Sequence, residues 1–336
     1  MIITAASFPT PELIKTTNNP GLWDQQDGFA RFQAAAANDS LAWLDERLDA
    51  ATTNTERSAA FVQLYRNLAE WRYQLGQREE GRSPNADVEQ YHRPIPADGP
   101  MVGVYGAGWR SEGGVRIDYA ANRLVGGSET PGSRMSDRLG EIIQSRFDAE
   151  APDSDVLQNR VALPDGRSIN GNLLMRGEAA SSARGMPFTL EGLYATRTGA
   201  QDDRRALQQE AFALLSGLEE RRAAGQAPDA GARREFGQAA YFLYQGPEYE
   251  RGGDAMIRTL LVTAHARVFD EALRIPQDVD VMAHTMNQQA YAEHFERTRS
   301  TVSGQTPAAD EQHAAADEQQ AAAVRPPERT NSLDRG

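Results

Sequence analysis

Hydrophobic side chains recur at helical spacing over the first third of the chain. Residues 29–51 carry a rough 3.6-residue period, and residues 56–77 carry a clearer one. In the second segment Phe61, Leu64 and Leu68 follow one another at steps of three and four residues. Such steps place side chains on one face of a helix. Both segments are therefore predicted to be helices of the core.

A second helical part is predicted from 203 to 301. Helical periodicity marks four segments, at 203–224, 232–245, 251–274 and 284–300. Glycine- or proline-containing stretches separate the first pair and the last pair, as expected between helices. The central stretch, residues 95–198, has a different pattern. Short alternating segments at 101–105 and 115–119 predict strands, and one helix is predicted near 134–147.

The segment 161–169 reads as a β-hairpin. Asp165 and Gly166 lie in the middle of this segment, and an Asp-Gly pair favours a tight primed turn. Pro164 beside the turn indicates an edge strand, because proline cannot donate a hydrogen bond to a neighbouring strand. Strands confined to a mostly helical chain predict an α+β fold that is mainly α.

Both ends of the chain are predicted to be disordered. Residues 4–20 are rich in Thr, Pro, Asn and Ser, so 1–28 is expected to be an unfolded leader that would suit an export signal. The tail 302–336 contains a near repeat at 308–312 and 315–319 and almost no aromatic or β-branched residues. The start lacks the basic and apolar regions of a secretory signal. Isoleucine stands at position 2, where myristoylation requires glycine, so no stable membrane anchor is expected.

Composition narrows the function. A net charge of −13 disfavours a nucleic-acid partner and adsorption to anionic membranes. The absence of cysteine excludes thiolate chemistry and disulfides. The five histidines have no metal-ligand spacing, so no metal cofactor is predicted; they are His92, His265, His284, His294 and His313. No apolar run is long enough to cross a membrane.

The basic residues are almost all arginine. Lys15 is the one lysine among 35 basic residues. Lysine accepts ubiquitin and acetyl groups, whereas arginine keeps the charge without that amine, so lysine depletion would lengthen the life of a protein delivered into a foreign eukaryotic cell. A GC-rich genome would produce a similar bias, and both explanations stay open.

The best local candidate for chemistry is the loop 245–254. It joins two predicted helices, and the second is expected to begin near Arg251. A helix N-terminus favours anions, Gly252 and Gly253 allow a phosphate to approach the backbone, and arginine can hold it bidentately. The alternative is an ordinary interhelical loop with a surface arginine. For Asp280, predicted at the start of the last helix, the alternative is an N-cap.

Several patches of the chain resemble the AvrB family of bacterial type III effectors, in order and over about residues 60–290. The patches are the helix segments 61–65 and 70–72 with 75–79, the hairpin residues 163–166, a Pro-to-Arg-Gly element at 247–252, and Asp280 after the Ile-Pro turn 275–276. The family's Pro-x-x-Arg-Gly element has one residue fewer than this chain. Order and spacing supply most of the resemblance.

The resemblance implies a two-lobed Fido fold, related to Fic proteins. A helical lobe would comprise 29–94 and 199–301, and a smaller mixed α/β upper lobe with the hairpin would comprise 95–198. It implies that Arg251, with Gly252 and Gly253, holds the diphosphate of a nucleotide or nucleotide-sugar, with the catalytic Asp280 lining the same pocket. The hairpin would hold the target peptide through Leu163, Asp165, Gly166 and Ser168.

The activity that the resemblance implies is transfer of a sugar such as rhamnose to a Ser/Thr hydroxyl of a host immune-regulatory protein. The protein would then act in the cytoplasm of a eukaryotic host, a plant above all, after secretion. This sequence departs from the family at several points. No histidine stands at 199–205, Gly99 occupies or adjoins the position of a family threonine, and the lipidation signal is missing. The histidine of the Fic motif is also absent around Gln245, which argues against AMP transfer.

Two other functions fit the sequence. A non-catalytic effector would grip a host protein by adding a peptide to the hairpin edge at 161–169. A mono-ADP-ribosyltransferase would use Glu248 and Glu250 as its Glu-x-Glu pair, with Arg160 or Arg176 holding NAD. Against the second, the glutamates lie between helices and no convincing Ser-Thr-Ser strand is present.

Overall fold

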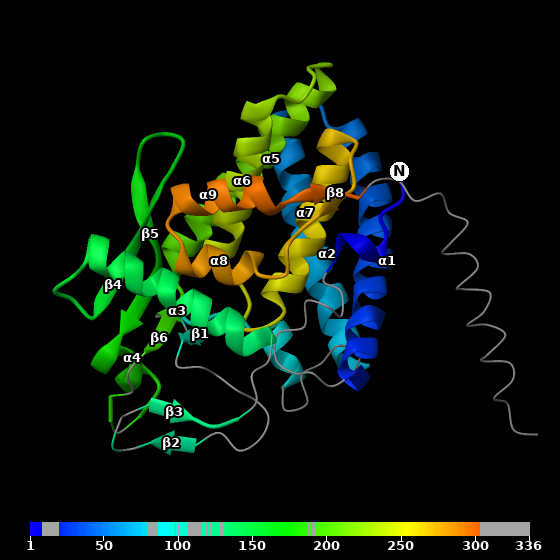
Figure 1. Ribbon diagram of the computed structural model, residues 1–336. Helices are drawn as coiled ribbons and strands as arrows, with labels where there is room; N and C mark the ends of the chain where they lie inside the picture. The colour runs from blue at the N-terminus through cyan, green and yellow to red at the C-terminus, as the bar shows by residue number, and fades with distance from the viewer. Residues whose placement is uncertain are drawn as a thin grey trace, which may run out of the picture. The chain divides into compact units, whose positions relative to one another are not determined.

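The computed structural model shows an arrangement of helices packed with a small antiparallel sheet (Figure 1). It describes residues 1–8, 20–78, 87–97, 99, 101–106, 116–118, 120, 123–127, 131–186, 188–189 and 192–302. The mainly helical α+β class predicted from the sequence is confirmed. Residues Met1–Thr301 belong to one compact unit.

Five long helices make most of the core. They are α1 (Pro20–Ala50), α2 (Asn54–Gln77), α5 (Gln201–Ala223), α6 (Ala230–Gln245) and α7 (Gly253–Phe269). Helix α7 packs against the other four, and most of its residues are buried, so it is the central helix. Its buried residues occur around the whole circumference, as expected for a helix surrounded by others, and include the polar side chains of Arg258, Thr259 and His265.

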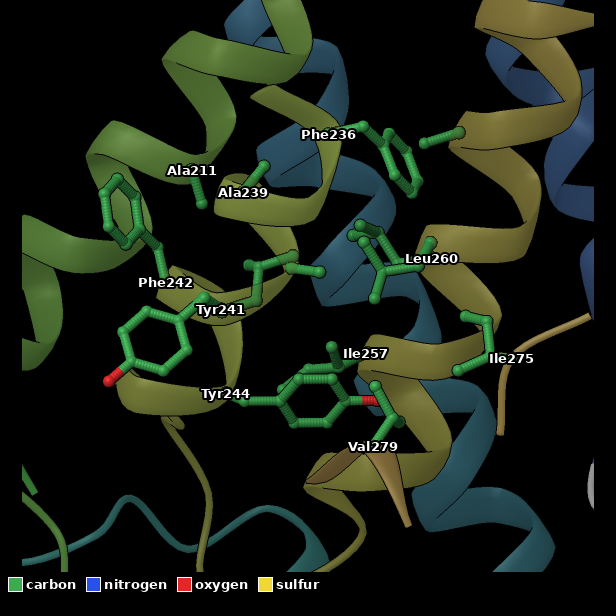
Figure 2. Close-up of a cluster of buried hydrophobic side chains, with 14 of the residues drawn as sticks. Ala211, Phe236, Ala239, Tyr241, Phe242, Tyr244, Ile257, Leu260, Ile275 and Val279 are labelled. Atoms are coloured by element: carbon green, nitrogen blue, oxygen red, sulfur yellow. The ribbon is translucent and has the colours of Figure 1, made fainter. Parts of the chain in front are cut away.

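Aromatic and aliphatic side chains fill the space between α6 and α7. Figure 2 shows Phe236 and Tyr244 of α6 reaching toward α7, which contributes Ile257 and Leu260, whereas Tyr241 points to the other side of α6. All five side chains are almost completely inaccessible to solvent. Burying an aromatic or aliphatic side chain contributes about 1.5–3 kcal/mol, so this layer is a main source of stability beside the candidate site.

Among the described residues, four strands form the main sheet in the order β1-β6-β5-β4. They are β1 (Met101–Gly106), β4 (Val156–Ala162), β5 (Ser168–Arg176) and β6 (Leu193–Arg197), and every pairing is antiparallel. Helix α3 (Pro131–Glu150) packs on β1 and β6, and the short α4 (Gly177–Ala183) packs on β5 and β6. A separate ribbon pairs β2 (Arg116–Asp118) with β3 (Arg123–Val125).

The hairpin β4–β5 is present, and β4 is an edge strand as Pro164 indicated. The turn differs from the predicted primed type. The Gly166 amide donates to the Leu163 carbonyl at 3.0 Å, so Pro164 and Asp165 are the central turn residues. Gly166 has a φ of 86°, whereas Asp165 is not among the described residues with positive φ. Proline fixes φ near −65°, which excludes a primed turn and shifts the left-handed residue to Gly166.

The last predicted helices have different boundaries. Helix α7 ends at Phe269, where Asp270 adopts a left-handed conformation, and β7 (Leu273–Arg274) then pairs with β8 (Ser300–Thr301). The predicted helix 284–300 is instead two helices, α8 (Val279–Thr285) and α9 (Gln288–Thr298). The side chain of Asn287 caps α9 by accepting from the Ala290 amide, which explains the break.

The N-terminal residues do not form the expected disordered leader where the structure describes them. Residues Ala5–Ser7 form a short 3-10 helix (η1), and Ile3 and Phe8 are buried in the core. The Asn38 side chain hydrogen-bonds to both the amide and the carbonyl of Ile3, at 2.9 and 2.7 Å. Helix α1 also begins at Pro20, well before residue 29. Residues 9–19 of the expected leader and 303–336 of the expected tail lie outside the described residues.

Candidate functional site

The loop between α6 and α7 is anchored at both ends. At its start, Gln245 is buried, and its amide group donates to the Ala283 carbonyl at 2.6 Å while its oxygen accepts from the Asn172 amide at 2.8 Å. These bonds tie α6, β5 and α8 together. Further on, the Ile95 amide donates to the Glu248 carbonyl at 2.8 Å, and Tyr249 forms a β-bridge with Pro94. The path of the loop is therefore fixed by residues distant in sequence.

Gly252 starts helix α7 in a conformation that requires glycine. Its φ is 79°, and a Cβ atom there would lie 2.8 Å from Cγ of Arg72 and 2.9 Å from a ring carbon of Tyr91. Arg72 is itself buried and stacks over the Tyr91 ring at 4.2 Å. On the other side, a Cβ at Gly253 would meet no atom within 4 Å. The backbone at the helix start is thus backed by packed side chains and open in front.

Arg251 is exposed and precedes the first residue of α7. Its Nε donates to Oε1 of Gln90 at 2.8 Å, and its backbone amide donates to the Gln90 carbonyl at 3.1 Å. Gln90 belongs to the short 3-10 helix η3 (Val88–Tyr91). These contacts hold the side chain beside the helix start.

A cleft of about 170 Å³ lies at this helix start. Arg251, Gly252 and Gly253 line it, and Asp280 from α8 lines it as well. The predicted anion-binding residues and the predicted catalytic residue are therefore brought together, although 29 positions separate Arg251 and Asp280 in sequence. The remaining lining residues are Ile95, Thr198, Tyr244, Pro247, Tyr249, Glu250, Asp254, Ile257 and His284.

An ion pair between a buried arginine and a partly exposed aspartate lies at this cleft. Arg258 is completely buried, and its Nη2 lies 3.0 Å from Oδ1 of Asp254. The Tyr244 hydroxyl donates to the same carboxylate at 3.1 Å, and Figure 2 shows Tyr244 reaching from α6 toward α7. Burial by itself lowers the pKa of Arg258, but the charges of Asp254 and Asp280 keep that pKa above the usual value for arginine. The guanidinium is therefore charged, and its charge is balanced by Asp254 on the same helix and by Asp280 of α8.

Asp280 does not cap a helix. Helix α8 begins at Val279, with Asp278 in the N-cap position, so Asp280 is inside the first turn. One helical turn further, His284 lines the same cleft. In the sequence, His284 is one of five histidines without metal-ligand spacing. The signal that could have found it is the four-residue spacing between Asp280 and His284, which places both side chains on one face of a helix.

His284 is held in one tautomer. Its Nε2 lies 3.2 Å from the Tyr244 carbonyl oxygen, and its own carbonyl accepts from the Asn172 side chain at 2.7 Å. A carbonyl can only accept a hydrogen bond, so Nε2 carries the proton of the neutral ring.

A threonine also reaches the cleft. Thr198 is 5% exposed, lines the cleft, and its hydroxyl has no hydrogen-bond partner among the described residues. Gly99 packs directly against it, because a Cβ at Gly99 would lie 2.5 Å from the Thr198 hydroxyl oxygen. Because Gly99 has no side chain, the Thr198 hydroxyl can occupy the space next to it.

The predicted peptide-binding hairpin lies apart from these lining residues. Leu163, Asp165, Gly166 and Ser168 do not line the cleft. The edge of β4 is already engaged near the turn, because the Gln288 side chain accepts from the Ala162 amide at 2.8 Å and donates to its carbonyl at 3.0 Å. Gln288 therefore pairs with Ala162 as a neighbouring strand would. A peptide that adds to β4 would have to pair with other residues of this strand or displace the Gln288 side chain.

The residues that would support ADP-ribosyl transfer are not assembled. Arg160 donates to Asn170 at 2.6 Å, and Arg176 donates to the Pro152 carbonyl at 2.6 Å while lying over the Phe147 ring. Neither arginine lines the cleft at α7. Glu250 does line it, but its carboxylate lies 3.3 Å from the Arg93 guanidinium. This arrangement does not favour a NAD site.

No protein-family model matches the chain, and no curated protein matches its sequence. Within the described ranges, no helix is long and apolar enough to cross a membrane. The described residues also contain no group of three or more His, Asp or Glu side chains placed to hold a metal ion. The interpretation of the site therefore depends on its geometry.

Proposed function

We propose that the cleft at the start of α7 binds a nucleotide-sugar and that the protein transfers the sugar to a Ser/Thr hydroxyl of a host protein. The protein would be an AvrB-like type III effector with a Fido-type site, secreted into a eukaryotic host and acting on an immune regulator. The observation that carries the proposal is that Arg251, the amides at Gly252 and Gly253, and Asp280 line one cleft.

The chemistry follows from these positions. The diphosphate of the donor would lie against the helix N-terminus and the guanidinium of Arg251, where backbone dipoles and a fixed charge both favour an anion. The acceptor oxygen would attack the anomeric carbon while the bond from that carbon to the phosphate oxygen breaks. The nucleoside diphosphate leaves with the negative charge that Arg251 and the amides stabilise.

The acceptor hydroxyl must lose a proton during this reaction. Four groups that line the cleft can act as bases, namely His284, Asp280, Asp254 and Glu250. Asp254 is less suited, because its carboxylate is paired with Arg258 and accepts from Tyr244. We assign the proton to His284 and assign Asp280 to orienting the sugar. In this assignment His284 would replace the histidine that the chain lacks at 199–205. Thr198 would replace the family threonine whose position Gly99 occupies or adjoins.

A titration with nucleotides tests the proposal. Calorimetry with ADP, UDP, dTDP and UDP-rhamnose should show micromolar binding of at least one diphosphate, and Arg251→Ala should weaken it by about 10-fold or more. Arg274→Ala removes an exposed arginine on β7 and is the matched control, with wild-type affinity expected. Intact-mass analysis of host proteins co-expressed with this chain would then identify the transferred group.

Absence of binding by all four compounds would overturn the transferase proposal. It would favour the non-catalytic effector. This alternative is supported by the position of β4 at the edge of the sheet, where a peptide of a host protein can add as a further strand. In that case Gln288→Ala should strengthen binding of a host protein, because it frees the backbone of Ala162.

A further inference from the structure

A second and larger cleft lies between α2 and α5. Its volume is about 430 Å³, which is large enough for a small metabolite. Val62, Tyr65 and Arg66 of α2 line one wall, and residues of α5 line the other. Figure 1 shows these two helices, which pack against each other. The cleft shares Ile95 and Pro247 with the cleft at α7 but contains neither Arg251 nor Asp280.

Arg204 places a buried positive charge in the wall of this cleft. It is 4% exposed, and it donates to the carbonyls of Gly199 at 2.6 Å and Ile95 at 2.9 Å. No carboxylate of a described residue pairs with it. Burial and the neighbouring charge of Arg205 lower the pKa of Arg204, which is the response of a cation that lacks a counterion. Carbonyl oxygens satisfy its hydrogen bonds but leave its charge without compensation.

Two further arginines line the cleft without an ion pair. Arg66 and Arg205 are exposed, and neither forms an ion pair or a hydrogen bond with the described residues. This is unusual in a chain of net charge −13, in which buried arginines such as Arg258 and Arg267 are paired with carboxylates. Three guanidinium groups around one concavity create a positive potential that favours an anion.

The other lining groups suit a hydroxylated ligand. Glu248 is the one acid among the lining residues, and a carboxylate accepts hydrogen bonds from hydroxyl groups. The carboxamides of Gln201, Gln208 and Gln209 can donate and accept. Tyr65 is 2% exposed, and its hydroxyl lies close to the backbone of Glu248. Tyr65 and Phe212 also present aromatic surface to the cleft.

From this combination we infer that the cleft between α2 and α5 is a binding site for a phosphorylated sugar or polyol. The phosphate would contact the guanidinium groups of Arg66 and Arg205, and the buried charge of Arg204 in the wall of the cleft would also attract it. The hydroxyl groups would bond to Glu248, the glutamine carboxamides and the Tyr65 hydroxyl. A bare carboxylic acid or an apolar ligand would leave part of this polar lining unpaired, which costs free energy. The site is separate from the proposed donor cleft and does not depend on the proposed function.

Calorimetry of the full chain with glucose 6-phosphate tests the inference, with glucose and inorganic phosphate as the two partial ligands. Glucose 6-phosphate should bind at least about 10-fold more tightly than either part, because only the whole molecule engages both the arginines and the hydroxyl-binding groups. Arg205→Ala and Arg66→Ala should each weaken this binding by about 10-fold. Both residues are exposed, so the variants should keep the wild-type circular dichroism and melting temperature.

Arg274→Ala is the control and should bind glucose 6-phosphate like the wild type. Equal affinity for inorganic phosphate and glucose 6-phosphate would overturn the assignment of a polyol ligand. Binding unchanged in both Arg66→Ala and Arg205→Ala, or no saturable binding up to about 10 mM, would overturn the site itself. If Arg251→Ala abolishes binding, the ligand occupies the donor cleft, and the inference fails while the proposed function is supported.

Discussion

Arg258 and Asp254 form an ion pair across one turn of α7, and this pair links the hydrophobic core to the candidate site. The Arg258 guanidinium is 0% exposed, whereas the Asp254 carboxylate is 37% exposed and lines the cleft. The guanidinium also donates to the Pro276 carbonyl at 2.7 Å and the Ile275 carbonyl at 3.2 Å. The segment before α8, and with it Asp280, is therefore positioned by a charge inside the central helix.

Replacing Asp254 should destabilise the protein. Asp254→Asn removes the counterion of a fully buried cation, and breaking a buried pair costs about 3–5 kcal/mol. Because Asp254 is partly exposed and Arg258 keeps its carbonyl partners, we expect a loss of about 2–3 kcal/mol in the free energy of unfolding. Urea denaturation measures it. Asp153→Asn, at an exposed turn position, is the control, and an equal effect of both variants would refute this role of Asp254.

His284 should matter for turnover more than for binding. Removing a general base lowers a rate by about 100-fold or more. We expect His284→Gln to reduce release of nucleoside diphosphate from the donor by that factor, while donor affinity stays within about twofold of wild type. If His284→Gln weakened donor binding but left turnover unchanged, His284 would be a donor-binding residue and not the general base. His92→Gln, at a histidine stacked on Tyr73 outside the cleft, should keep full activity.

The free energy of unfolding should decrease as the pH falls from about 6.5 to 4, because of His265. Burial lowers the pKa of His265 to about 4, and its ring packs against Phe236 and Phe269. In the unfolded chain a histidine binds a proton below about pH 6.5, whereas the folded chain resists protonation until about pH 4. The unfolded state is therefore favoured progressively as pH falls through this window, by up to about 3 kcal/mol.

The variant His265→Gln isolates this contribution. It removes the titrating ring, so the free energy of unfolding should fall less steeply with decreasing pH than in the wild type. Urea denaturation at pH 7, 6 and 5 measures the slope. His92→Gln, which removes a histidine 35% exposed, should retain the wild-type slope. Parallel slopes for wild type and His265→Gln would contradict the prediction.

Two glycine-to-alanine substitutions should change the stability of the protein in opposite directions. Gly166→Ala adds a methyl group where no atom lies within 4 Å, but it forces alanine to a φ of 86° and should destabilise by about 1 kcal/mol. Gly217→Ala also adds its methyl group in open space, inside α5, where alanine favours the helix by about 0.5–1 kcal/mol. Thermal unfolding of the two variants measures the difference. A destabilised Gly217→Ala or a stabilised Gly166→Ala would contradict this reading of the backbone.

Much of the helical architecture could be predicted because it depends on local pattern. The apolar face of 56–77 appears as α2 at Asn54–Gln77, and the break at 225–231 separates α5 from α6. Where local signals were weak, the prediction failed. The polar composition of 4–20 suggested a disordered leader, but Ile3 and Phe8 are buried in the core, and Asn38 of α1 hydrogen-bonds to the backbone of Ile3.

The sequence by itself determined which residues carry suitable chemistry: a glycine-flanked arginine before a helix, an aspartate after an Ile-Pro turn, and a proline-restricted hairpin. Only the tertiary structure decided which of them meet. His284 faces a cleft because Asn172, far away in sequence, holds its backbone, and Arg204 is buried under the carbonyl of Ile95. Periodicity reports which side of an element is buried, whereas the partner of a buried polar group depends on contacts between distant segments.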